Sequence, residues 1–131
     1  MTAIEETAVA TALVARPLDG WVEVCVLDRL TPDRGVAALV EDRQVAVFRL
    51  SDATLHAVDN VDPCSGAAVL SRGIVGDAGG RVTVASPLYK QRFDLDTGVC
   101  LDADVRPLTV HHIAIVEGVV FVLGRSEPTD T

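Results

Sequence analysis

The chain has 131 residues and a formal net charge of -8, from 11 Lys and Arg against 19 Asp and Glu. This length suits one domain. A hydrophobic content of 49% and a mean hydropathy of +0.34 support a packed core. The acidic balance argues against a nucleic-acid or anionic-membrane partner, because either would need a basic face. Ten glycines, six prolines and few aromatic residues favour short strands and turns over a helix bundle.

Short apolar runs, some of them alternating, predict strands along most of the chain. In order, these strands cover residues 21–28, 36–40, 45–50, 54–58, 74–75, 81–85, 92–95, 108–116 and 119–123, and residues 100–101 form a short return strand. Turns are expected at 31–33, 41–44, 76–80, 96–98 and 117–118. The absence of an amphipathic helical pattern predicts an all-β sandwich or small barrel.

The ends of the chain differ from this middle part in pattern. We expect residues 1–18 and 125–131 to be mobile and residues 19–124 to form the single β domain. The N-terminal segment carries Glu5 and Glu6 where a signal peptide would have a basic start. The three cysteines Cys25, Cys64 and Cys100 make a poor disulfide framework and no zinc motif. These features predict a cytoplasmic protein with reduced thiols.

Two loops carry the most specific pattern in the sequence. Residues 62–67 read D-P-C-S-G-A, and residues 86–94 read S-P-L-Y-K-Q-R-F-D. They resemble the two cluster-binding boxes of Rieske iron–sulfur domains, C-P-H-x-G-A and C-P-x-H-G-x-x-F-D. In that family each box gives one Cys and one His to a [2Fe–2S] cluster at the tip of a β-sandwich. The resemblance runs from about residue 21 to residue 123 and implies a Rieske-like antiparallel β-sandwich of short strands.

The cluster ligands of that family are missing. The two Cys positions hold Asp62 and Ser86, and the two His positions hold Cys64 and Tyr89. Carboxylate and hydroxyl oxygens are poor substitutes for the thiolate and imidazole ligands of such clusters, and one thiol cannot hold two irons. We therefore expect the fold to be kept without an iron–sulfur cluster, and we expect no metal, cofactor-binding or catalytic residue in this chain.

Longer runs around the same loops indicate a narrower family. Residues 60–67 read N-V-D-P-C-S-G-A, residues 71–77 read S-R-G-I-V-G-D, and residues 86–102 read S-P-L-Y-K-Q-R-F-D-L-D-T-G-V-C-L-D. These runs resemble the small subunits of assimilatory NAD(P)H-dependent nitrite reductases. The resemblance implies a non-catalytic subunit that supports the six-electron reduction of nitrite to ammonium. It also implies a large subunit as partner, which carries siroheme, a [4Fe–4S] cluster and FAD and uses NAD(P)H.

The side chains around the two loops allow several interpretations. Asp62 is expected to accept loop N–H groups, and Ser86 and Tyr89 to form hydrogen bonds across the site. Cys64 is either a plain loop residue or a redox-sensitive thiol, the latter if Lys90 or Arg92 lowers its pKa.

Four further polar residues near the loops, Arg72, Lys90, Gln91 and Arg92, form a candidate docking surface for the partner. Two alternative functions stay open on the sequence alone. One is a Rieske-type ferredoxin-like electron-transfer protein with altered cluster ligation, and the other is a free-standing binding or regulatory module.

Overall fold

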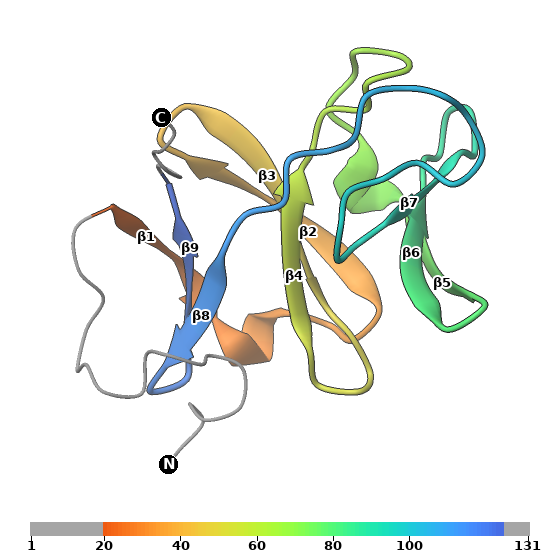
Figure 1. The fold of residues 1–131 in the computed structure, drawn as a ribbon. Coiled ribbons are helices and arrows are strands. Elements are labelled where there is room, and N and C mark those ends of the chain that lie inside the picture. The colour runs from red at the N-terminus through yellow and green to blue at the C-terminus, as the bar shows by residue number, and fades with distance from the viewer. Residues whose placement is uncertain (1–19, 125–131) are drawn as a thin grey trace.

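The computed structural model describes residues 20–124, and Figure 1 shows their course. The segments predicted to be mobile, 1–18 and 125–131, lie outside the described residues, so their mobility stays a prediction. Regular structure in the described part consists of strands and two short 3-10 helices, which confirms the all-β prediction. No helix between residues 20 and 124 is long and apolar enough to cross a membrane.

Between residues 20 and 124, nine strands and two single-turn helices follow one another. They are β1 (Trp21–Val26), η2 (Leu27–Arg29), β2 (Arg34–Val40), β3 (Arg43–Arg49), β4 (Leu55–Asp59), η3 (Leu70–Arg72), β5 (Ile74–Ala78), β6 (Arg81–Ala85), β7 (Arg92–Asp94), β8 (Ile113–Val116) and β9 (Val119–Leu123).

The strands form three antiparallel sheets of three strands each. Their orders are β1-β9-β8, β2-β3-β4 and β5-β6-β7, and the second sheet lies between the other two in Figure 1. Strand β3 explains this arrangement, because four successive residues, Val45 to Phe48, are fully buried. Val45 and Val47 pack into a core with residues of β8 and β9, whereas Ala46 and Phe48 pack into a second core with residues of β6 and β7. A continuous apolar run therefore marks a strand that is covered on both faces.

Two turns are tighter than the sequence indicates. The turn expected over residues 41–44 consists of Glu41 and Asp42 alone, because Val40 pairs with Arg43. Both turn residues have positive φ, 49° and 73°, as a two-residue hairpin of the favoured twist requires. Likewise, β5 continues through the expected connection 76–80 and leaves only Gly79–Gly80 as the turn.

Two predicted strands are shorter in the structure. Of the expected strand 108–116, only Ile113–Val116 is regular. Residues 109–111 run beside β4 instead, where the N–H of His111 donates to the carbonyl of Ala57 at 2.8 Å. The expected return strand 100–101 is reduced to one bridge between Cys100 and Phe93. The first of these segments pairs with β4, which is distant in sequence, and the second pairs with β7, only a few residues earlier.

The topology brings the two informative loops to one end of the molecule. Strand β4 leads into residues 60–69, and β6 leads into residues 86–91, at the top of Figure 1. We call residues 60–69 the first loop, residues 86–91 the second loop, and the two together the tip.

Candidate functional site

The first loop folds around the carboxylate of Asp62, which is fully buried. Its Oδ1 accepts a hydrogen bond from the N–H of Cys64 at 2.8 Å. Its backbone carbonyl accepts from the N–H of Gly66 at 2.7 Å, and its own N–H donates to the carbonyl of Ala67 at 2.8 Å. The expectation that Asp62 accepts loop N–H groups is thus confirmed, and the first loop closes on this one residue.

The second loop folds around Ser86 in a similar way. Ser86 is 1% exposed, and its N–H donates to the carbonyl of Gln91 at 2.9 Å. Its carbonyl accepts from the N–H of Lys90 at 2.8 Å, and its Oγ accepts from the N–H of Leu88 at 3.3 Å. Lys90 sits in the left-handed region with φ of 64°. Each loop is therefore organised by the residue that stands in its former Cys position.

These two organising residues bind one another. The Ser86 hydroxyl donates to Oδ2 of Asp62 at 2.6 Å, in a buried environment. The hydrogen bond across the site expected for Ser86 is confirmed. Tyr89 does not take part, because its side chain is 60% exposed and has no hydrogen bond within the described part of the chain. Its expected bond across the site is wrong, because the turn of the second loop carries the ring outward from the buried pair.

Cys64 is half-buried beside Asp62. Partial burial raises the pKa of the Cys64 thiol, and the neighbouring carboxylate of Asp62 raises it further. An activated thiol requires a shift in the opposite direction. Arg92, one proposed activator, instead contacts Asp102 through two hydrogen bonds of 2.7 and 2.9 Å. The structure therefore favours Cys64 as a loop residue of low reactivity.

The four former ligand positions do not fit a [2Fe–2S] cluster. A Rieske centre takes two thiolates and two imidazoles. Here the carboxylate of Asp62 and the hydroxyl of Ser86 already satisfy each other and the loop N–H groups, and Tyr89 is exposed. Within residues 20–124, no three His, Cys, Asp or Glu side chains lie together in a way that could hold a metal ion. A ferredoxin with altered ligation therefore lacks support from the donor set at the tip.

The four candidate docking residues differ in their availability. Arg72 and Lys90 are exposed, whereas Gln91 is only partly exposed and its Oε1 is buried without a hydrogen-bond partner. The guanidinium of Arg92 is held by Asp102. Of these four residues, only Arg72 and Lys90 thus carry an exposed positive charge that makes no ion pair with another described residue.

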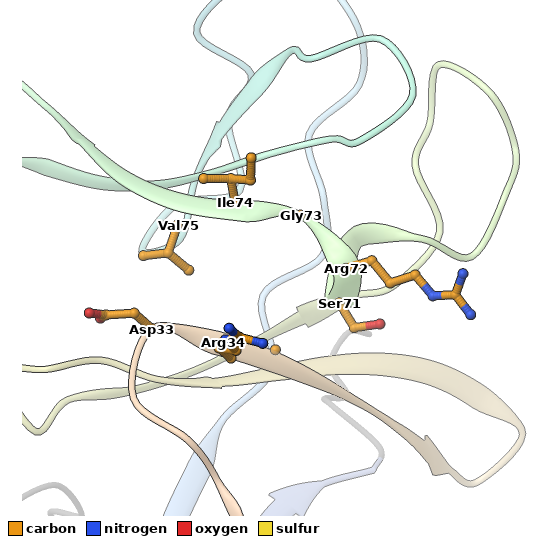
Figure 2. Close-up of a pocket in the computed structure, with 8 residues that line it drawn as sticks. Asp33, Arg34, Ser71, Arg72, Gly73, Ile74 and Val75 are labelled. Atoms are coloured by element: carbon orange, nitrogen blue, oxygen red, sulfur yellow. The ribbon is translucent and has the colours of Figure 1, made fainter.

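Arg72 also borders a groove of about 500 Å³ between the start of β2 and the η3–β5 segment. Figure 2 shows Asp33 and Val75 facing each other across this groove, while the side chain of Arg72 points away from it. The two backbones come close here: a Cβ on Gly35 would lie 2.5 Å from the carbonyl oxygen of Ser71. No local sequence pattern predicts this groove, because its walls come from segments nearly forty residues apart.

Sequence reasoning also missed an apolar surface at the tip. Val61, Leu88 and Tyr89 are 37%, 50% and 60% exposed, respectively. Exposed apolar side chains that lie close together often mark contact surfaces. The sequence does indicate this exposure, because Leu88 and Tyr89 follow Pro87 in a predicted loop, and side chains in loops usually lie at the surface.

Comparison with known proteins places this geometry in a family. Residues 20–123 match the model of the Rieske-like [2Fe-2S] domain. The chain is 38% identical over 105 residues to the nitrite reductase (NADH) small subunit of Escherichia coli K12, covering 79% of this chain and 97% of the relative. The chain belongs to the nitrite reductase small-subunit family. The predicted Rieske-like fold and the predicted family are thereby confirmed.

Two further relatives extend this placement. A crystal structure from Mycobacterium tuberculosis, described as an NADH-dependent nitrite reductase small subunit, is 53% identical with a TM-score of 0.75, covering 78% of this chain and 92% of that one. A nitrite reductase large subunit of Klebsiella oxytoca is 41% identical over 121 residues. That match covers 88% of this chain and 12% of the much longer relative. A small-subunit domain thus occurs both as a separate chain and within a large-subunit chain.

Proposed function

We propose that this chain is the cofactor-free small subunit of an assimilatory NAD(P)H-dependent nitrite reductase in the cytoplasm. Similarity to known small subunits supports the subunit role. The observation that carries its cofactor-free character is the hydrogen bond between Asp62 and Ser86, which occupies two former ligand positions and leaves no donor set for a redox cluster. Electron transfer then belongs to the large subunit. Siroheme, a [4Fe–4S] cluster and FAD there supply the chemistry that takes electrons from NAD(P)H to nitrite.

The role left to this chain is to bind the large subunit and support its activity. The tip is the proposed contact surface. Val61, Leu88 and Tyr89 supply exposed apolar area. Of the two exposed cations, Lys90 lies in the second loop and Arg72 lies in η3, directly after the first loop. An apolar centre with charges at its rim is the usual composition of a protein interface. In a chain with a net charge of -8, the two cations also favour contact with an acidic surface.

The Klebsiella relative supports this choice of partner. A domain of this kind is part of the same polypeptide as a large subunit there. When two domains are joined in one chain in one organism and separate in another, the separate chains are good candidates for a stable complex, because linkage only raises their effective concentration.

The test is to produce the large subunit with and without this chain. We expect the two chains to co-purify and NADH-driven nitrite reduction to fall when the small chain is omitted. The double variant Leu88→Ser/Tyr89→Ser should weaken co-purification, and the matched control Ile74→Ser should not, because Ile74 is 74% exposed but lies on β5 outside the tip. Full activity without the small chain would refute the subunit role.

A further inference from the structure

Within the described residues, the two loops of the tip are joined by one hydrogen bond. The other hydrogen bonds of these loops close each loop on itself or tie it to its own neighbouring segment, as with the pairs Asp62–Ala67 and Ser86–Gln91. Only the bond from the Ser86 hydroxyl to the Asp62 carboxylate crosses from one loop to the other. It is short, at 2.6 Å, and both residues are almost completely buried.

This hydrogen bond joins the same two loops that an iron–sulfur cluster joins in ligand-bearing Rieske domains. In ligand-bearing Rieske domains the cluster joins two loops because each loop contributes ligands to it. Asp62 and Ser86 stand in the two Cys positions, one in each loop. A hydrogen bond between an ionised carboxylate and a hydroxyl is among the stronger types, and burial shields it from competing water.

We propose that the Asp62–Ser86 bond is a metal-free clasp that takes over the cross-linking role of the cluster and holds the tip in its binding shape. The two residues act as positioning residues. They are too buried to contact a partner themselves, but they fix the turns that present Val61 and Leu88. This inference rests on the proposed contact between the tip and the large subunit.

The clasp also links the internal order of the two loops. Oδ1 of Asp62 holds the N–H of Cys64, and Oγ of Ser86 holds the N–H of Leu88. Loss of either side chain removes the bond between the loops and leaves the other side chain buried without its partner. A change in one loop should therefore loosen the backbone of both loops, which a residue that acts within its own loop cannot do.

The experiment measures amide hydrogen exchange in the isolated chain and binding to the large subunit for one set of variants. The set comprises Asp62→Ala, Ser86→Ala, the double variant and the conservative Ser86→Thr, which keeps the hydroxyl. Ser65→Ala is the matched control, because the Ser65 hydroxyl accepts only from the N–H of Ala67 in its own loop, at 3.1 Å. If Asp62→Ala fails to fold, Ser86→Ala still tests the clasp, because it removes only the hydroxyl that donates to Asp62.

We expect either alanine variant to speed exchange at least tenfold in both loops and to weaken binding at least tenfold. The double variant should be scarcely worse than the single variants, because the second change removes a partner that is already lost. Ser86→Thr should restore slow exchange and tight binding, and Ser65→Ala should affect the first loop alone. A metal chelator should leave exchange in the wild-type chain unchanged.

Faster exchange confined to the altered loop, or additive losses in the double variant, would overturn the clasp. Loosening of both loops with unchanged binding would show that the clasp orders the tip but does not prepare it for the partner, and would overturn the positioning role. If the wild-type chain does not bind the large subunit, the proposed function fails. The exchange data from the isolated chain still decide whether the clasp exists.

Discussion

Replacing Lys90 with glycine separates the cost of its backbone conformation from the use of its side chain. Lys90 has φ of 64° and lies in the second loop, where the ligand-bearing Rieske box has a glycine. A residue with a Cβ in this region costs roughly 1–2 kcal/mol. Lysine at this position thus destabilises the fold, and backbone strain of this kind is often found at functional sites.

The expected changes in stability and binding have opposite signs. Glycine removes the strain but adds roughly 0.5–1 kcal/mol of conformational entropy to the unfolded chain. The Lys90→Gly variant should therefore be as stable as the wild type or up to about 1.5 kcal/mol more stable, which corresponds to a rise in Tm of several degrees. Loss of an interface cation worth about 1 kcal/mol should weaken binding to the large subunit about fivefold.

Glu117 provides the matched control. It is also exposed, has φ of 52° and lies in the β8–β9 turn rather than at the tip. Urea unfolding should show similar changes in stability for Lys90→Gly and Glu117→Gly. Titration with the large subunit should show weaker binding for Lys90→Gly alone, and this loss of affinity should be smaller at high salt. Unchanged binding of Lys90→Gly, or equal weakening by both variants, would refute the docking role of Lys90.

Four further predictions follow from the same geometry. Gly98→Ala should destabilise the fold by roughly 2–4 kcal/mol in urea unfolding, because Gly98 has φ of +80° and a Cβ there would overlap a backbone carbonyl. The control Gly79→Ala should cost about 1 kcal/mol, because Gly79 has φ of +63° but open space around it. Burial raises the pKa of Asp59, but its histidine and arginine partners outweigh burial and hold that pKa below 3.8. The stability contributed by ionised Asp59 should therefore be present above pH 4 and be lost as the pH falls towards 2. A stability that does not change over this range would contradict the prediction. Cys64 should be alkylated at pH 7 more slowly than in the urea-unfolded chain, because burial and the Asp62 carboxylate raise its pKa; equal rates would revive the reactive-thiol hypothesis. The purified chain should be colourless and free of iron by metal analysis, and a rhombic EPR signal after dithionite would overturn the assignment of the tip.

Most strands could be predicted because they depend on local patterns, and the meeting of the two loops could be predicted because the resemblance to Rieske domains implies it. Alternating apolar residues define most strands, and the motif around Asp62 and Ser86 fixes which loops face each other. The sequence also predicts a hydrogen bond from Ser86 across the site, but the structure is needed to identify Asp62 as its partner.

The features that sequence reasoning missed depend on contacts between distant residues. Arg92 was expected to be free for docking, but its charge is neutralised by Asp102, ten residues along the chain. Residues 109–111 continue the predicted strand in sequence but pair with β4 rather than with β9. The direction of the Cys64 pKa shift depends on how deeply the first loop closes. None of these contacts produces a periodic pattern of apolar residues from which it could be predicted.

The double burial of β3 has a consequence for how the molecule unfolds. Val45 and Val47 belong to one core, and Ala46 and Phe48 belong to the other, so neither core can melt without releasing the strand that the other needs. Unfolding should therefore be one cooperative transition, although the chain is divided into three small sheets. Binding energy gained at the tip is then shared by the whole domain, and the sheet farthest from the partner should gain protection along with the loops that touch it.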